Sequence, residues 1–300
     1  MLAEVLEGLA VRPAGTYVDA TYGRGGHARA VLESLGPEGG LVVVDRDPQA
    51  VASARREFGS DARVLVHHST FDQLAALLAG RRVDGVLLDL GVSSPQLDDP
   101  ARGFSFLRDG PLDMRMDPGS GASAAEFLAG ASEAELAGVI SRYGEERFAR
   151  RIAAALVAAR RGAPLTTTGE LAALVAAAVP ARSREPGKHP ATRTVQALRI
   201  HVNRELEQLE GGLAAALAVL AGGGRLVVLS FHSLEDRCVK RCLRRQAGGD
   251  PVWRGLPGAP PESRPTLALV GGAQHPRPAE IAANPRARSA VLRVAERLRA

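Results

Sequence analysis

An apolar segment runs into a glycine-rich turn at Val18-Asp19-Ala20-Thr21-Tyr22-Gly23-Arg24-Gly25-Gly26-His27 (residues 18–27). A β-prone run that ends in glycines and continues into a helix is typical of the first unit of a nucleotide-binding sheet. Glycine has no Cβ, so the backbone can turn sharply there and lie close to a ligand. The spacing of Gly23, Gly25 and Ala28 also fits the dinucleotide fingerprint G-x-G-x-x-G/A, so the turn alone leaves the kind of ligand open.

Short β-prone runs alternate with helical patterns around this turn, which indicates parallel βαβ units. The predicted strands are residues 16–20, 41–45, 63–67 and 83–90, and the predicted helices are residues 26–35, 48–58 and 71–79. A second α/β stretch has a long helix at 194–220, the glycines 222–224, a strand at 225–230, a helix at 234–245 and a last strand at 289–298. The sequence therefore predicts an α/β fold with a Rossmann-like, doubly wound, mostly parallel sheet.

The middle of the chain lacks this alternation of strands and helices. Residues 91–121 are rich in Gly, Pro, Asp and Ser and have no period, residues 123–179 are helical and Ala-rich, and residues 180–190 form a basic loop. Long loops at strand ends are usually functional. We expect two domains: one formed by residues 1–102 and 197–300, and a helical domain inserted at 103–196. The first domain contains a Pro- and Gly-rich tail at residues 248–286.

Composition excludes several classes of protein. Of 300 residues, 45% are hydrophobic and 24% are charged, which is typical of a globular protein. The chain has no uncharged apolar run of about eighteen residues and no signal-peptide pattern at its start, so we expect a cytoplasmic location and no membrane partner. The two cysteines, Cys238 and Cys242, are expected to be free thiols, and no metal site is predicted.

The basic side chains are almost all arginine, and the formal net charge is +5. Two explanations stay open: a compositional bias that also produces the heavy use of Ala, Gly and Leu, and recognition of phosphate by planar guanidinium groups. The charge therefore favours a nucleic-acid partner only slightly.

Acidic residues follow three of the predicted strands. Asp45 lies twenty residues after Gly25, where an acid can accept hydrogen bonds from both ribose hydroxyls of an adenosyl ligand. Asp19 and Asp89 lie at the ends of the first and fourth strands. Because carboxylates attract cations, these two acids suit a sulfonium ligand with an ammonium group better than a pyrophosphate.

Eight segments resemble a known family. They are DATYGRGGH (19–27), DRDPQA (45–50), LLDLGVSSPQLDDPARGFSF (87–106), GPLDMRMDP (110–118), YGEERFARRIA (143–153), KHPATRT (188–194), SFHSLEDR (230–237) and NPRARSA (284–290). The resemblance, which spans nearly the whole chain, is to the bacterial 16S ribosomal RNA (cytosine-N(4))-methyltransferase family, known as RsmH or MraW. That family usually opens with a longer leader than Met1-Leu2-Ala3-Glu4-Val5-Leu6, and Tyr22 stands where Phe is common.

The resemblance implies a class I S-adenosylmethionine-dependent methyltransferase. Its substrate would be the exocyclic amine N(4) of a decoding-centre cytidine, presented by 16S rRNA or the small ribosomal subunit. The implied cofactor residues are Gly25, Gly26 and His27 on the methionine side, Asp45 at the ribose, Phe71 beside the adenine, and Asp89 and Gln96. Only the resemblance implies the cofactor roles of Phe71 and Gln96. Without it, Phe71 would be predicted to lie in a helix core and Gln96 in a solvated loop.

Transfer to an amine needs acceptors for its hydrogens, because the lone pair of this nitrogen is delocalised into the ring. Asp89 is the candidate catalytic residue, and Ser93, Ser94 and Pro95 of the following loop are candidate substrate contacts. His232 is a further candidate for this role, as a general base or a substrate contact.

Basic residues are the expected RNA contacts. The basic loop, extended to Arg193, supplies Arg182, Arg184, Lys188, His189 and Arg193. The helical stretch supplies Arg142, Arg147, Arg150, Arg151, Arg160 and Arg161, which fit a solvated helix face equally well. Three alternatives stay open: a nicotinamide-dependent dehydrogenase, a catalytically idle ribosome-assembly factor, and a homodimer in place of a monomer.

Overall fold

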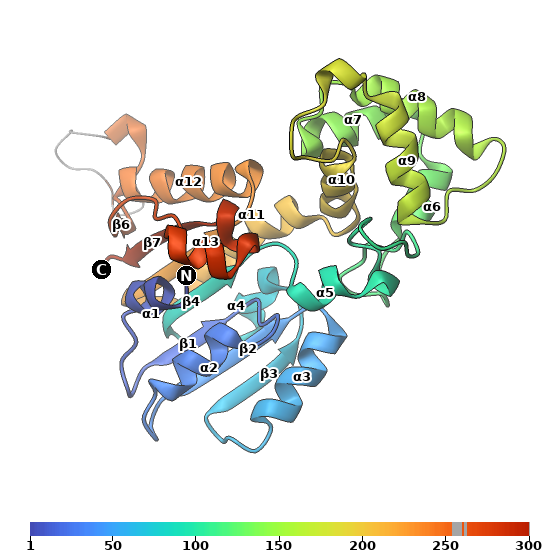
Figure 1. The fold of residues 1–300 in the computed structure, drawn as a ribbon. Helices are drawn as coiled ribbons and strands as arrows, with labels where there is room; N and C mark the ends of the chain where they lie inside the picture. Colours follow the sequence, from blue (N-terminus) through green and yellow to red (C-terminus); the bar gives the residue numbers. More distant parts are fainter. Residues whose placement is uncertain (254–259, 261–262, 300) are drawn as a thin grey trace. The chain divides into compact units, whose positions relative to one another are not determined.

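The computed structural model describes residues 1–253, 260 and 263–299 (Figure 1). The chain divides into two compact units: a sheet unit, Met1–Gly91 with Leu206–Ala300, and a helical unit, Val92–Glu205. Of the predicted Pro- and Gly-rich tail, residues 254–259, 261 and 262 lie outside the described residues, as does the last residue of the predicted first domain. The helical unit is longer at both ends than the predicted inserted domain, residues 103–196. It begins at Val92 with the loop that follows Gly91, and it ends at Glu205 because it includes the whole helix Thr192–Val202.

In the described part of the sheet unit, seven strands form one sheet in the order β3-β2-β1-β4-β5-β7-β6 (Figure 1). They are β1 (Thr16–Asp19), β2 (Gly40–Asp45), β3 (Val64–His68), β4 (Val83–Asp89), β5 (Leu220–Ser230), β6 (Leu267–Leu269) and β7 (Val291–Arg297). The first five strands pair in parallel, and β7 is antiparallel to both β5 and β6. The strand order reverses between β1 and β4, which is where ligands bind in sheets of this kind.

Helices cover both faces of this sheet. They are α1 (Leu2–Leu9), α2 (Gly26–Glu33), α3 (Pro48–Phe58), α4 (Leu74–Leu77), α11 (Glu205–Val219), α12 (Ser233–Gly248) and α13 (Pro278–Ala283). Side chains alternate along each strand, so Val42 and Val44 of β2 join the core with α4, α11 and α12, while Leu41 and Val43 join the core with α1, α2 and α3. The predicted fold class, a Rossmann-like and mostly parallel sheet, is confirmed.

The helical unit has its own core. Its helices are α5 (Ser94–Asp98), α6 (Ala124–Gly130), α7 (Glu133–Gly144), α8 (Ala149–Arg160), α9 (Thr168–Ala178) and α10 (Thr192–Val202). Three of them begin at a Ser or Thr followed three residues later by Glu, a reciprocal capping box that satisfies free backbone N–H groups. Ile140, Ile152 and Leu171 are fully buried between these helices.

The prediction of one long helix at 194–220 is wrong. The structure has two helices, and Arg204 between them takes a positive φ of 49°. The side chain of Asn203 ends α10, because its Nδ2 donates to the carbonyl of Met114 at 2.7 Å and its Oδ1 accepts from the N–H of Met116 at 2.8 Å. Asn side chains that bind backbone groups compete with the helix in this way.

Four smaller expectations are also corrected. The glycines at 222–224 lie within β5, which begins at Leu220, and the predicted helix at 71–79 is a 3₁₀ turn, Phe71–Gln73, followed by the short α4. The loop at 91–121 contains α5 and the 3₁₀ turn Pro100–Arg102. Helices α1 and α13 were not predicted, because each is short and their stabilising contacts lie outside the local sequence.

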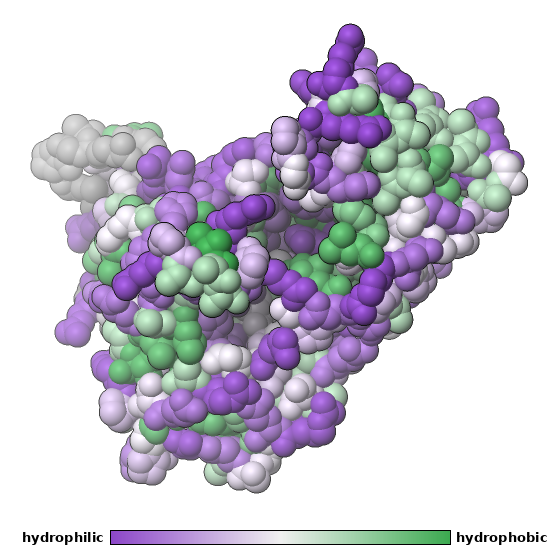
Figure 2. All heavy atoms as spheres, viewed as in Figure 1, coloured by the Kyte–Doolittle hydropathy of each residue, from purple (hydrophilic) through white to green (hydrophobic). Residues whose placement is uncertain are grey.

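No helix in the described part of the chain combines the length and the apolar character that crossing a membrane requires. The hydropathy of the visible surface agrees with two separately folded units, since hydrophilic side chains cover much of each of them (Figure 2).

Candidate active site at the carboxyl edge of the sheet

Three aspartates end the strands at the switch point of the sheet. Asp19 is the last residue of β1, Asp45 of β2 and Asp89 of β4. Because β1 pairs in parallel with both other strands, the three carboxylates lie at one edge of the sheet. This edge therefore carries negative charge where a nucleotide-binding sheet holds its ligand.

The glycine-rich turn after β1 leaves room for a ligand. Gly25, at a positive φ of 75°, precedes the first residue of α2 and donates its N–H to the carbonyl of Tyr22 at 2.8 Å. A Cβ added at Gly25 would lie 2.6 Å from the Tyr22 ring, whereas a Cβ added at Gly26 would meet no atom within 4 Å. Gly25 is thus required by the fold, and Gly26 keeps a space open.

Asp45 holds the glycine turn in place. Its Oδ2 accepts from the N–H of Gly23 at 2.9 Å and its Oδ1 accepts from the N–H of Asp47 at 2.8 Å. Burial raises the pKa of Asp45, against the effect of these backbone hydrogen bonds. A carboxylate oxygen has more than one lone pair, so the predicted bonds to ribose hydroxyls remain available and stay a prediction.

Asp19 is a buried acid with an oxygen that lacks a partner. Its side chain is 2% exposed, its Oδ1 accepts from the N–H of Thr21 at 3.2 Å, and its Oδ2 has no hydrogen-bond partner among the described residues. Burial raises the pKa of Asp19 to about 6, and the charges of Asp89 and Asp45 add to the rise, while His27 opposes it. Asp19 is therefore sensitive to any cation that reaches it.

His27 of α2 faces Asp89. Its Nε2 lies 3.4 Å from Oδ2 of Asp89, and its Nδ1 and Oδ1 of Asp89 have no hydrogen-bond partner in the part of the chain that the structure describes. Burial lowers the pKa of His27, but the hydrogen bond and charge of Asp89 and the charge of Asp19 outweigh it and raise the pKa above its ordinary value. The backbone N–H of Asp89 is fixed by Thr21 Oγ1 at 2.6 Å.

These atoms allow a test of which ligand fits. Buried polar atoms in proteins nearly always have partners, so Oδ2 of Asp19, Oδ1 of Asp89 and Nδ1 of His27 are the atoms that a ligand would satisfy. Two of the three are carboxylate oxygens, which attract an ammonium or sulfonium group and repel a pyrophosphate. The residues present therefore fit S-adenosylmethionine and fit a nicotinamide dinucleotide poorly.

Phe71 lies three residues beyond the end of β3, which pairs with β2 in a register that sets His68 opposite Asp45. Its half-buried ring lies on α11, since a Cβ added at Gly212 would come within 2.1 Å of the ring. Asp72 Oδ1 beside it is buried and has no hydrogen-bond partner among the described residues. Phe71 thus packs against the core as its bare sequence suggests, at the same edge of the sheet as Asp45.

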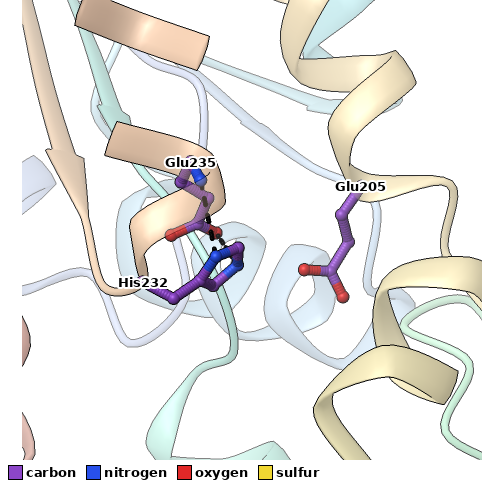
Figure 3. A group of neighbouring side chains, drawn as sticks. All are labelled: Glu205, His232 and Glu235. Carbon is purple, nitrogen blue, oxygen red and sulfur yellow. Dashed lines mark hydrogen bonds and ion pairs between the residues drawn. The ribbon is translucent and has the colours of Figure 1, made fainter. Parts of the chain in front are cut away.

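His232 follows β5, the strand next to β4, and begins α12 (Figure 3). Its Nδ1 accepts from the N–H of Glu235 at 3.4 Å, and its Nε2 lies 3.2 Å from Oε1 of that residue. Glu235 is buried, and its Oε2 accepts from the N–H of Phe231 at 2.8 Å. The imidazole is therefore engaged in capping α12, and its predicted role in catalysis or substrate binding stays a prediction.

The predicted substrate loop belongs to the helical unit. Ser93 begins α5 in a capping box with Gln96, whose Oε1 accepts from the N–H of Ser93 at 2.9 Å. Gln96 is buried, Ser94 is half-buried and Pro95 is exposed. Gln96 thus shapes the loop that follows Asp89 and Gly91, whether or not it also meets the cofactor.

The basic loop borders a cavity within the helical unit. The cavity has a volume of about 360 Å³ and is lined by Glu146, Arg147, Phe148, Val179, Ser183, Arg184, Glu185, Lys188, His189, Pro190 and Arg193. Of the five predicted loop residues, the structure brings Arg184, Lys188, His189 and Arg193 together there, and Arg182 is not among the lining residues.

The arginines of the helical stretch do not form one group. Arg147 lines the cavity and lies over the Phe148 ring, 4.8 Å from its centroid. Arg160 instead donates to the carbonyl of Leu128, and Arg142 lies over the ring of Tyr143. Arg150, Arg151 and Arg161 are not among the residues that line the cavity.

Sequence reasoning missed several partners at these sites. Glu235 was not predicted, because His is not among the residues that usually begin a capping box and the sequence therefore carries no signal for this pair. Thr21 and its bond to the N–H of Asp89 were missed because the two residues are 68 apart in the chain. Glu185, which contacts both Lys188 and Arg193, was also missed.

The fold and this edge define a class of protein. A sheet in the order β3-β2-β1-β4-β5-β7-β6 with β7 antiparallel, a glycine turn after β1 and an acid after β2 are the features of a Rossmann-like methyltransferase. The chain belongs to the MraW methylase family, which matches residues 1–298, so the resemblance seen in the sequence is confirmed.

Similar proteins match the chain over nearly its whole length. The chain is 58% identical over 99% of its length to "Ribosomal RNA small subunit methyltransferase H" of Xanthomonas euvesicatoria pv. vesicatoria, covering 88% of that protein. It is also 58% identical to the protein of that name from Thioalkalivibrio sulfidiphilus, covering 99% of this chain and 96% of that one. The rRNA methylase structure from Streptococcus thermophilus is 11% identical with a TM-score of 0.43, over 99% of this chain and 92% of that one, and supports no assignment.

As a member of a methylase family, this chain uses S-adenosylmethionine as its methyl donor. The cofactor expected from the sequence is confirmed, and the residues expected to hold it stay a prediction.

Proposed function

We propose that this protein transfers a methyl group from S-adenosylmethionine to the exocyclic amine N(4) of a cytidine in the decoding centre of 16S rRNA. Membership of the methylase family and the names of the two relatives, which state small-subunit ribosomal RNA, support rRNA methylation. The sequence resemblance narrows the target to cytosine N(4).

One observation carries the proposal. Oδ2 of Asp19, Oδ1 of Asp89 and Nδ1 of His27 are buried without hydrogen-bond partners among the described residues. His27 directly follows Gly26, where an added Cβ would meet no atom within 4 Å. Two anionic oxygens in such a place favour a cationic ligand. This arrangement supports a methyl donor over the dinucleotide of the alternative dehydrogenase.

Different residues at the edge of the sheet contact different parts of the donor. S-adenosylmethionine supplies an electrophilic methyl group on its sulfonium when it is bound. Gly25 and Gly26 admit its methionine portion, with His27 and Asp19 at the ammonium group. Asp45 accepts from the ribose hydroxyls and Phe71 packs beside the adenine. Gln96 acts by shaping the loop that follows Asp89 and Gly91.

Asp89 is the residue that prepares the substrate amine. Its Oδ2 faces His27 at 3.4 Å, so Oδ1 is the oxygen that can accept an amine hydrogen while its negative charge also attracts the cationic donor. A hydrogen bond to Oδ1 favours a lone pair localised on nitrogen, and the same carboxylate takes up the proton that the amine loses on methylation. Positioning and electrostatics at this carboxylate then provide most of the rate.

The helical unit is the proposed substrate-recognition domain. A base must leave its stack before an enzyme can modify it, and the backbone on each side of it must be held. Contacts to phosphate are assigned to Arg182, Arg184, Lys188, His189 and Arg193, and contacts near the base to Ser93, Ser94, Pro95 and His232. These residues supply cations and hydroxyl groups, the groups that commonly bind phosphate and sugar.

The experiment combines binding with product analysis. Calorimetry should show saturable binding of S-adenosylmethionine and none of NAD. Incubation with labelled donor and undermethylated small subunits, followed by mass spectrometry of nucleosides, should yield N(4)-methylcytidine. Binding without turnover would favour the idle assembly factor, and a methyl group on another base or atom would overturn the proposed target.

A further inference from the structure

Glu185 lies where an anion would bind in the helical unit. Its Oε2 is 3.9 Å from Nζ of Lys188, and its Oε1 contacts Nη2 of Arg193. Both cations line the cavity of about 360 Å³, together with Arg147 and Arg184. Glu185 thus pairs with two of the four cationic side chains that line the cavity, which Glu146 also lines.

The local sequence builds this arrangement. Glu185-Pro186-Gly187-Lys188 is a tight turn in which the N–H of Lys188 donates to the carbonyl of Glu185 at 3.3 Å. Gly187 has a φ of +72°, and Pro followed by such a glycine is the pattern of a type II turn. The turn sets the side chains of residues 185 and 188 next to each other, so the local chain favours their pairing.

The neighbouring cations are held by backbone carbonyls. Arg193 donates Nη1 to the carbonyl of Glu145 at 3.1 Å, Arg184 donates to that of Ala176 at 2.7 Å, and Arg147 donates to that of Ser183 at 3.3 Å. These bonds fix the guanidinium groups without neutralising their charge. The cations are therefore preorganised, and among the described residues Glu185 is the acid that contacts both Lys188 and Arg193.

We propose that Glu185 is an internal substitute for a phosphate of the RNA substrate and that this phosphate displaces it from Lys188 and Arg193. A phosphodiester carries one negative charge and two free oxygens, as a carboxylate does, so the exchange conserves charge and hydrogen bonds. The inference rests on RNA being the substrate, and it concerns how that substrate is admitted.

Exposure makes the exchange feasible. The side chains of Glu185 and Lys188 are 54% and 44% exposed, and exposed ion pairs contribute little to stability. Glu185 can therefore leave its partners without unfolding the loop, whose turn is kept by backbone hydrogen bonds. Hydrophilic side chains gather at this end of the helical unit, where the chain passes from α9 to α10 (Figures 1 and 2).

An aromatic pair beside the cations favours RNA over a free anion. The rings of His189 and Phe106 lie with their centroids 4.7 Å apart, and His189 lines the cavity. Aromatic side chains next to a cationic groove are the usual platform for unpaired bases.

The test compares Glu185→Gln with Glu133→Gln, which removes the same charge from an exposed position of the same unit. Affinity for a short fluorescein-labelled single-stranded RNA, measured by anisotropy, should rise roughly two- to fivefold in E185Q, the size expected for an exposed charge pair. E133Q should change it less. Equal effects of the two variants would overturn the inference.

A double-mutant cycle removes the ambiguity of a general charge effect. Lys188→Gln should weaken RNA binding more in the E185Q background than in the wild type, because only there is Lys188 free for RNA in the unbound protein. It should also lower the salt slope of binding by about 0.7 in that background. Additive effects would show that Glu185 does not compete with RNA.

Two further measurements separate the causes of failure. Inorganic phosphate should compete with the labelled RNA only weakly, and strong competition by phosphate alone would identify a free-anion site and overturn the role of RNA. If wild-type protein methylates small-subunit RNA while the cycle is additive, the inference fails and the proposed function stands. Absence of both RNA binding and methylation in the wild type would instead refute the proposed function.

Discussion

The sheet unit and the helical unit hold their charged groups in opposite ways. At the sheet edge, Asp19 and Asp89 each have a carboxylate oxygen without a partner among the described residues. In the helical unit, Lys188, Arg193 and Arg184 are each engaged by a carboxylate or a backbone carbonyl. Buried charges interact strongly and are screened little, whereas exposed charges interact weakly and are screened by salt.

This difference predicts how substitutions should act. A change at the sheet edge removes an interaction that no other group replaces, so its effect should be large and independent of salt. A change in the helical unit removes one of several exposed cations, so its effect should be small and should decrease as salt rises.

The largest effect is expected for Asp89→Asn. The amide keeps the shape of the carboxylate and its acceptor oxygen but cannot take up a proton, so methylation should fall by about 100- to 1,000-fold. Single-turnover assays with labelled donor and small subunits measure this, and calorimetry should show a much smaller loss of donor affinity. The exposed Glu38→Gln serves as control. Undiminished methylation by D89N would remove Asp89 from the mechanism.

The next effect comes from a matched pair of glycine substitutions. Gly26→Ala should leave thermal stability unchanged or slightly higher, since the added Cβ meets no atom within 4 Å, yet it should reduce donor affinity by at least about tenfold by filling ligand space. Gly25→Ala should destabilise the fold by about 1–2 kcal/mol, the cost of a left-handed conformation, in addition to the contact with Tyr22.

Thermal melts and calorimetry of both glycine variants check this prediction. A loss of stability in G26A together with unchanged donor binding would mean that the space beside Gly26 belongs to the fold and not to the ligand.

Asp19→Asn should separate stability from binding. The pKa of Asp19 is raised to about 6 by burial, so the folded state binds a proton more tightly than the unfolded state. Its contribution to stability is therefore fully present below about pH 4 and is lost as pH rises towards 6. At pH 7.5 the neutral Asn should raise the free energy of unfolding by up to about 3 kcal/mol, since one pKa unit corresponds to about 1.4 kcal/mol.

The same substitution should weaken the donor site. In the wild type, donor affinity should increase as pH rises through about 6, because ionised Asp19 attracts the ammonium group. In D19N affinity should be about tenfold lower at pH 7.5, and its dependence on pH in this range should be reduced. A variant that loses stability at pH 7.5, or binds the donor as wild type does, would contradict the assignment.

Sequence patterns predicted the central strands β1, β2 and β4 well because these strands are largely buried on both faces. A continuous apolar run such as residues 41–44 can be read locally, and the acids that follow each strand mark the carboxyl edge. The positions of Asp19, Asp45 and Asp89 followed directly from this reading. The position of the three aspartates at this edge was therefore predictable, but the contacts that they make there were not.

Contacts between distant residues could not be read in the same way. The side chain of Asn203 ends α10 through Met114 and Met116, 89 and 87 residues away, so helical periodicity alone ran on to residue 220. The pairing of His27 with Asp89 likewise depends on strand order. Whether a buried atom such as Oδ2 of Asp19 has a hydrogen-bond partner depends on how the chain packs, so it could not be predicted from the sequence.

The smallest expected effect tests the helical unit, through two arginines that the sequence could not distinguish. Arg184 lines the cavity and Arg182, two residues earlier, does not. Arg184→Gln should therefore weaken RNA binding by roughly two- to fivefold at low salt, with a salt slope lower by about 0.7, while Arg182→Gln should have a smaller effect. Donor affinity should remain unchanged in both, because the proposed donor site is at the edge of the sheet and not in the helical unit. Equal losses in the two variants would show that RNA follows the charge of the whole loop and not the cavity, and a loss that persists at high salt would show that the helical unit holds its ligand by buried contacts, as the sheet unit does.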